Sequence, residues 1–277
     1  MNPDSIFIFS SYPNKIILYN LHGVKENEWE TGWKSKEATP EISSNTVRPC
    51  LLYDNKLFFS SPVLFEGSNY SHKDVPQGGV FNFSTEHMEP FIYHPYKYFK
   101  ANWGHTHLKM SFHTFNLDQK RMIVSFPASS YLYIYDMNNY SIDSVYCPSE
   151  YIRNIKPFSR SRDAAYEAMK SIRYYASTPT FHGIFYDKYN KVYYRFGQLP
   201  NPKRTFNRYD INQSLDKEMI IMIIDENFNV LGETVIGFDH FYEGVFVTPE
   251  GLAIREKTNN EDIVRYSIYK LKYIFDE

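Results

Sequence analysis

The feature that most constrains the fold is a recurrence of short apolar and aromatic runs, each of strand length, separated by Asn, Asp, Gly and Pro. In the clearest set, four runs follow one another from Leu108 to Cys147, joined by short turns such as Met137-Asn138-Asn139. Runs of this length between turn residues predict antiparallel hairpins. We therefore predict a four-stranded meander in this segment.

Further sets of runs repeat this pattern along the chain. The other predicted strands are Ile6–Ser10, Lys15–Asn20 and Val24–Trp33; Cys50–Tyr53, Leu57–Ser60, Gly79–Ser84 and Pro90–Tyr93; Phe181–Tyr186, Lys191–Phe196, Met219–Asp225 and Val230–Ile236; and Gly244–Val247, Leu252–Arg255 and Ile263–Tyr273. Repeated four-stranded units are typical of propeller blades, which stack face to face. We expect an all-β fold of four-stranded antiparallel blades that forms one propeller domain over residues 1–277.

Stacking of this kind also explains a continuous apolar run from Met219 to Ile224. A strand that is covered on both faces does not need to alternate apolar with polar residues. The run is too short for a transmembrane helix, and it ends at the turn residues Asp225-Glu226-Asn227.

One segment has helical spacing instead. From Ser161 to Ala176 the apolar residues Ala165, Ala168, Met169, Ile172 and Tyr175 fall on one face, opened by Ser161 and closed before Pro179. We predict a short helix at 161–176 between the third and fourth sets, with an apolar face that covers part of the fold.

Charge and cysteine content exclude some classes of function. The formal net charge of -2 arises from 30 basic and 32 acidic residues spread along the chain, so we expect no nucleic-acid partner. Cys50 and Cys147 form no CxxC pair, which argues against a thiolate metal site but leaves a disulfide open. We expect no transmembrane segment, and residues 1–4 do not resemble a signal peptide.

Several segments, among them 125–136, 177–189 and 191–196, resemble an uncharacterised family of TolB-like six-bladed propeller proteins from Bacteroidetes, typically lipoproteins. The later segments 224–229 and 246–252 are similar as well. The resemblance implies a six-bladed propeller in the cell envelope, periplasm or outer membrane. It also implies a lipoprotein leader and opening strands that are not seen in this chain, and it carries no activity.

In a propeller the residues just before each innermost strand line the rim of the central channel. By this rule the candidate ligand-binding residues are Arg48 before the second set, Trp103, His105 and His107 before the third, His182 at the start of the fourth, and His240, Tyr242 and Glu243 before the fifth. The loop 198–218 opens on the same rim and carries Lys203, Arg204 and Arg208.

These residues allow more than one interpretation. His105 and His107 alternate, so in a strand both imidazoles would face one side and could bind a metal or an anion; the alternative is an ordinary hydrogen-bonding or solvated role. Arg195 lies within an apolar strand, where it either joins two blades through ion pairing or stacking, or anchors an anion near the channel. Tyr70, Tyr96, Tyr98 and Trp103 could offer exposed rings to a sugar or pack within the sheets.

No nucleophile-elbow, zincin, dinucleotide or P-loop motif occurs, and Asp118, Asp136, Asp187 and Asp225 fall at turns. The leading hypothesis is a non-enzymatic module that binds a small ligand, glycan or protein at the channel rim. The alternative is a metal-assisted propeller hydrolase or lyase that acts on a saccharide or lactone. The sequence identifies no cofactor. We expect a monomer, whereas an incompletely closed ring would predict aggregation or strand-exchanged dimers.

Overall fold

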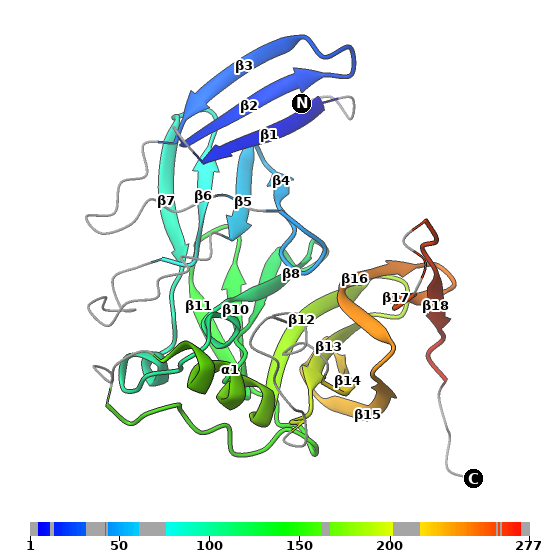
Figure 1. Ribbon diagram of the computed structural model, residues 1–277. Helices are drawn as coiled ribbons and strands as arrows, with labels where there is room; N and C mark the ends of the chain where they lie inside the picture. The colour runs from blue at the N-terminus through cyan, green and yellow to red at the C-terminus, as the bar shows by residue number, and fades with distance from the viewer. Residues whose placement is uncertain are drawn as a thin grey trace.

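The computed structural model describes residues 5–11, 14–31, 42, 44–60, 76–161, 167–201, 217–258, 260 and 262–272. Within these residues the regular structure consists of five antiparallel sheets, the helix α1 (Ala168–Ser177) and two short 3-10 helices, η1 (Tyr96–Phe99) and η2 (Thr106–Leu108) (Figure 1). No helix in this part of the chain is long and apolar enough to cross a membrane.

Each sheet is a meander in which every strand pairs with its neighbours in sequence. In chain order the sheets contain β1 (Ser5–Ser11), β2 (Asn14–Asn20) and β3 (Lys25–Glu30); β4 (Leu51–Tyr53), β5 (Lys56–Ser60), β6 (Gly78–Asn82) and β7 (His87–Ile92); β8 (Phe112–Asn116), β9 (Arg121–Ser125), β10 (Tyr131–Asp136) and β11 (Ile142–Tyr146); β12 (Thr180–Asp187), β13 (Val192–Gln198), β14 (Met219–Asp225) and β15 (Val230–Gly237); and β16 (His240–Thr248), β17 (Gly251–Glu256) and β18 (Tyr266–Tyr269). The predicted all-β class and the grouping of the strands are confirmed.

Among the described residues, four hydrophobic cores hold the five sheets together, and each core is shared by two or three successive sheets. Leu57 and Phe59 of β5 pack toward β2, whereas Phe58 between them packs toward the third sheet. Ile123 of β9 meets the fourth sheet, and Ile221 of β14 meets the fifth. Face-to-face stacking of consecutive four-stranded meanders is the arrangement found in β-propellers.

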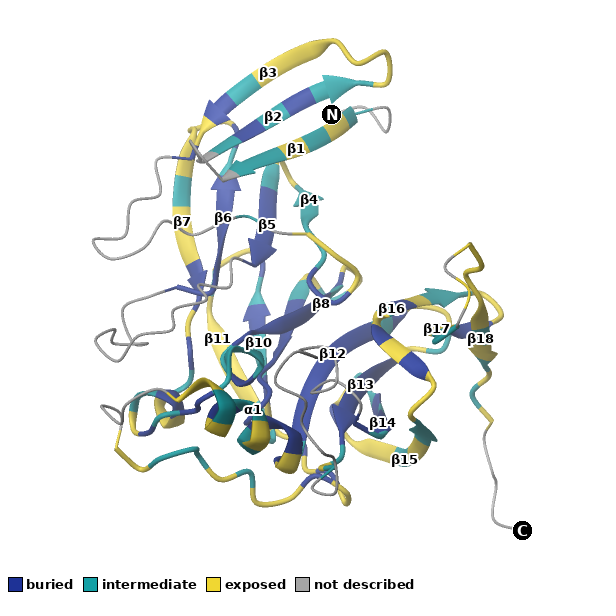
Figure 2. Ribbon diagram, viewed as in Figure 1, coloured by how far each residue is buried: buried dark blue, intermediate teal, exposed yellow. Residues whose placement is uncertain are grey.

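The apolar run Met219–Ile224 has the surroundings that the sequence predicted. Ile220, Met222 and Ile224 belong to the core shared with the third sheet, and Met219 and Ile221 belong to the core shared with the fifth. Burial is greatest in the inner strands: β13 is buried along its whole length, whereas the outer strands β11 and β15 are largely exposed (Figure 2).

Several boundaries differ from the prediction. The strand expected at Gly244–Val247 begins at His240, so His240, Tyr242 and Glu243 lie within β16 instead of before it, and the strand expected at Ile263–Tyr273 is limited to Tyr266–Tyr269. The strand expected to begin at Leu108 begins at Phe112, because Thr106–Leu108 form the 3-10 helix η2. The helix expected from Ser161 begins at Ala168 in the described part of the chain, and residues 162–166 lie outside it. Tyr175 is buried as predicted, but Ala168 is exposed and the buried face instead includes Ser171 and Ala176.

The two cysteines are free thiols. Burial raises the pKa of Cys50 to about 11 and also raises the pKa of Cys147, which is fully buried. The reactive thiolate of Cys50 is therefore a small fraction, below about 1%, at pH 8, and burial disfavours the thiolate of Cys147 as well. We expect both thiols to react slowly with a thiol-specific chromogenic reagent in the native protein and rapidly in denaturant. Fast labelling of one thiol in the native protein would contradict this burial.

Candidate functional site

The innermost strands of the fourth and fifth sheets are both interrupted by β-bulges. In β12, Phe181 pairs with Gly197 and Ile184 with Arg195, so that His182 and Gly183 together lie opposite Phe196. In β16, a similar shift between Phe241 and Val245 places Tyr242, Glu243 and Gly244 in the irregular stretch. Bulges re-aim side chains and are common next to binding sites. Here they bring the rings of His182 and Tyr242 to a centroid distance of 4.4 Å.

A segment before the second sheet, residues 45–49, runs between three innermost strands. The Val47 carbonyl accepts a hydrogen bond from the backbone of His113 on β8, and the Pro49 carbonyl contacts the His113 Nε2 at 2.7 Å. Thr46 donates its hydroxyl to the backbone carbonyl of Glu243 on β16. A Cβ on Gly183 would lie 2.9 Å from a Val47 methyl, so glycine is needed in the bulge of β12. Arg48 is thereby carried into the middle of the fold.

The helix α1 contributes an aromatic stack to the same region. Tyr175 at its C-terminal turn lies nearly parallel to His105 and His107, with ring centroids 4.8 and 5.3 Å away. The two imidazoles are stacked on each other at 5.0 Å. The two imidazoles lie on the same side, as the alternating spacing predicted, but not because they belong to a strand. His105 caps the 3-10 helix η2, and its Nδ1 accepts a hydrogen bond from the backbone N–H of His107.

A buried lysine completes the arrangement. The Lys217 ammonium donates to the carbonyls of Tyr175 and Thr178 at 3.1 and 2.5 Å and to the Thr180 hydroxyl at 3.3 Å. It also lies 4.4 Å from the centre of the Tyr175 ring. We refer to Arg48, His107, Tyr175, His182, Lys217 and Tyr242 as the central cluster.

Burial and nearby cations keep the histidines of this region neutral. Desolvation, with the charges of Lys217 and Arg48, lowers the pKa of His107 to about 4, and burial lowers the pKa of His105 to about 3. Burial, Lys217 and His107 hold the pKa of His182 well below its usual range. Burial also lowers the pKa of the Arg48 guanidinium, and Glu243 partly opposes this effect.

Several nitrogens of the central cluster have no hydrogen-bond partner among the described residues. These atoms are Nε and Nη1 of Arg48, Nδ1 of His107 and Nδ1 of His182. Arg48 is only 9% exposed and His182 is fully buried. A buried polar atom without a partner is costly and needs an explanation, for which an unseen ligand or water is a usual answer.

Two of the predicted rim residues, Trp103 and His240, lie elsewhere. Trp103 is 2% exposed and packs with Tyr98 in the core between the second and third sheets, so neither ring is available to a sugar. His240 contacts the Tyr269 hydroxyl within the fifth sheet, at 3.0 Å. Of the other aromatic residues considered for sugar binding, Tyr96 is exposed, whereas Tyr70 lies outside the described residues, as do Lys203, Arg204 and Arg208.

Arg195 lies between the third and fourth sheets. Its guanidinium donates to the Ser125 hydroxyl at 3.0 Å, to the Ser129 carbonyl at 2.7 Å and to the Cys147 carbonyl at 3.5 Å. Its Cζ stacks 3.6 Å from the centre of the Phe181 ring. Of the two interpretations of Arg195, these contacts favour the stack between blades, although no carboxylate takes part in it.

Within the described residues no group of three His, Cys, Asp or Glu side chains is placed to hold a metal ion. Three of the four turn carboxylates serve the backbone as predicted: Asp136, Asp187 and Asp225 each accept two backbone N–H groups that follow them. Asp118 instead pairs with the Lys191 ammonium.

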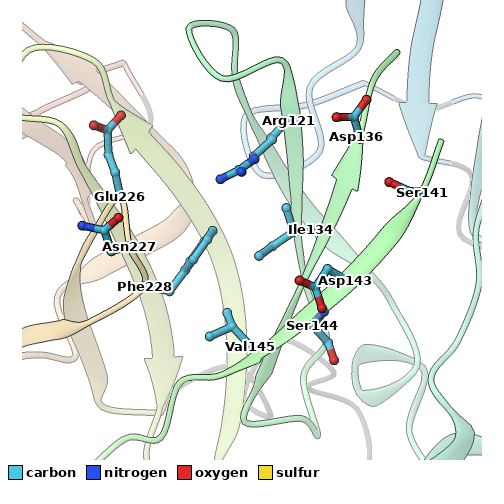
Figure 3. A pocket seen from close by; sticks show the side chains of 10 residues that line it. All are labelled: Arg121, Ile134, Asp136, Ser141, Asp143, Ser144, Val145, Glu226, Asn227 and Phe228. Atoms are coloured by element: carbon cyan, nitrogen blue, oxygen red, sulfur yellow. The ribbon is translucent and has the colours of Figure 1, made fainter. Parts of the chain in front are cut away.

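A groove of about 520 Å³ lies on the surface between the third and fourth sheets (Figure 3). Its charged side chains already have partners: Glu226 accepts from Tyr186 and Asn116, Asp136 caps its turn, and Arg121 donates to Gln119. The groove therefore lacks the unpartnered buried donors that mark the central cluster.

The sequence did not indicate Lys217 or the polar role of Tyr175. The helical spacing predicts Tyr175 only on the covering face of the helix, whereas its hydroxyl donates to Gln198 at 3.0 Å and contacts His182 at 3.4 Å. The available signal for Lys217 is its position, since this lysine lies two residues before a strand that is buried on both faces.

The fold and site define an all-β protein of stacked, propeller-like sheets with a polar cluster at their inner edges. The chain belongs to the DUF4221 family, described as a domain of unknown function, whose family model matches residues 1–235. This confirms that the family is an uncharacterised one. A comparison with curated proteins found no match.

Several solved structures also match this chain. A crystal structure of a DUF4221 member from Bacteroides vulgatus matches with a TM-score of 0.69 at 19% identity, over 92% of this chain and 70% of that one. At this identity the likeness supports the fold alone. A putative 6-phosphogluconolactonase from Bacteroides uniformis matches with a TM-score of 0.46 at 9% identity, over 96% of this chain and 68% of that one. The WD40 domain of Toxoplasma gondii coronin matches with a TM-score of 0.44 at 9% identity, over 96% of this chain and 55% of that one.

Proposed function

We propose that this protein is a non-enzymatic binding module that takes a small ligand into the central cluster. The observation that carries the proposal is the set of buried nitrogens on Arg48, His107 and His182 that have no partner among the described residues. These residues come from three separate parts of the chain: the segment 45–49, the 3-10 helix η2 and the bulged strand β12. A binding site needs this kind of convergence of a few polar groups in apolar surroundings.

Ligand screening by thermal unfolding tests the proposal. We expect at least one member of a panel of neutral sugars, small carboxylates, phosphates and short peptides to raise the melting temperature of the wild-type protein. A ligand present at 100 times its Kd adds about 2.7 kcal/mol to the stability of the folded state. For a chain of this size that gain corresponds to a rise of roughly 5–10 °C.

The matched variants are Arg48→Met, which removes the unpartnered guanidinium, and Arg153→Met, which removes an exposed arginine elsewhere. Arg48→Met should abolish the stabilisation and Arg153→Met should retain it. If no compound stabilises the wild type, or if both variants respond as the wild type does, the central cluster is not the binding site.

Finer features of the architecture are also proposals. We propose that the five sheets belong to one propeller domain of the TolB-like, six-bladed type, and that the native protein is a monomeric lipoprotein of the cell envelope. The shared cores between successive sheets support the single domain, and the family resemblance supports the rest. Sedimentation of the full-length protein would test the monomer, and lipid labelling in cells would test the anchor.

A further inference from the structure

We infer that the ligand of the central cluster is an oxyanion, a carboxylate or phosphate group carried by a small molecule. This inference rests on the proposed function, because it names the chemical class that the same site would take. It begins with Arg48, whose guanidinium nitrogens can only donate hydrogen bonds. Two of them, Nε and Nη1, are buried without a partner among the described residues, so the matching group must be an acceptor.

The charge of Arg48 favours a negative acceptor. Arg48 is buried, its guanidinium stays protonated, and no ion pair among the described residues involves it. Glu243 is the one carboxylate among the groups acting on Arg48; it also acts on Tyr242 and Tyr175, and as an exposed residue it compensates the guanidinium only in part. Lys217 satisfies its hydrogen bonds with neutral oxygens, and burial holds the pKa of its amine well below the usual range, so it adds less positive charge to the region than Arg48 does. A buried guanidinium that is compensated only in part favours a bound anion.

A buried nitrogen of His182 adds to the site. The His182 Nε2 lies 3.0 Å from the Thr180 hydroxyl and 3.4 Å from the Tyr175 hydroxyl. The Nδ1 is buried beside the Tyr242 ring and has no partner among the described residues. In the tautomer of the neutral imidazole that carries hydrogen on Nδ1, this nitrogen is a second N–H donor. Planar guanidinium and N–H donors together are well suited to a carboxylate or a phosphate.

Isothermal titration calorimetry of the full chain with citrate, inorganic phosphate and glucose, at constant ionic strength, tests this assignment. We expect citrate or phosphate to bind and glucose not to bind. The anion that binds more tightly identifies whether the site prefers a carboxylate or a phosphate group. Arg48→Met should weaken binding by about 10- to 100-fold, as expected for loss of a charge-assisted hydrogen bond. Arg48→Lys should retain part of the affinity, and Arg153→Met should retain all of it. Far-ultraviolet circular dichroism and the melting temperature establish that each variant is folded.

The outcomes separate the two proposals. Arg48-dependent binding of glucose or another neutral compound, with no binding of either anion, would overturn the oxyanion assignment and leave the proposed binding site standing. Anion binding that is unchanged in Arg48→Met would place the anion elsewhere and also overturn the assignment. If no compound in the wider screening panel binds in an Arg48-dependent way, both proposals fail together.

Discussion

Ile220→Ala and Ile221→Ala are each expected to lower the free energy of unfolding by about 2–5 kcal/mol, the usual cost of removing a buried isoleucine side chain down to Cβ. The two residues are adjacent on β14 and point to opposite faces of the fourth sheet. Both are buried all the same: Ile220 is 0% exposed and Ile221 is 3% exposed. Both substitutions therefore leave a cavity, one in each neighbouring core. Urea unfolding followed by circular dichroism measures the loss.

The matched control lies on the outer strand of the same sheet. Leu231 on β15 is 53% exposed, so Leu231→Ala should change the stability by no more than about 0.5 kcal/mol. A sheet covered on one face only would give a large loss at Ile220 or at Ile221, but not at both. That result would contradict the stacked arrangement of the sheets.

Arg195→Met is expected to lower the free energy of unfolding by about 2–3 kcal/mol, because buried acceptors on the third sheet would lose their donor. Methionine replaces much of the side-chain volume, so the loss reports mainly the hydrogen bonds to Ser125 and Ser129 and the stack on Phe181. Equilibrium unfolding in urea gives the value.

The variant Arg195→Lys tests whether the charge of the side chain or its planar shape supplies the stability. Lysine keeps the positive charge but lacks the planar fork that reaches several acceptors at once, so it should recover less than half of the lost stability. Citrate or phosphate binding should be unaffected in either variant that stays folded. An Arg195→Met protein of wild-type stability that has lost anion binding would instead make Arg195 a ligand anchor.

Much of the fold could be predicted because strands and hairpin turns are local features. The run Met219–Ile224 and its closing turn identify a doubly buried strand without any tertiary information. The 3-10 helix at Thr106–Leu108 could not be identified in this way, because its residues also suit a strand. Its conformation depends on the turn before it, where Gly104 has a φ of +62° and donates its N–H to Asn102.

The candidate site was predicted less completely, because it depends on contacts between distant segments. The rim rule identified Arg48, His107, His182 and Tyr242, which the structure does bring into one region. It also selected Trp103 and His240, whose surroundings are set by packing within their own sheets. Lys217 was missed because only the fold places it against the carbonyls at the end of α1.

The sharing of each core by successive sheets also has a consequence for how the molecule unfolds. Contacts between adjacent units dominate, so stability resembles that of a linear array in which each unit is supported by its immediate neighbours. Amide hydrogen exchange should then be graded along the chain rather than uniform. The slowest exchange is expected in β13 and β14, which belong to a sheet with a core on either side, and faster exchange in β2, whose sheet shares a single core among the described residues.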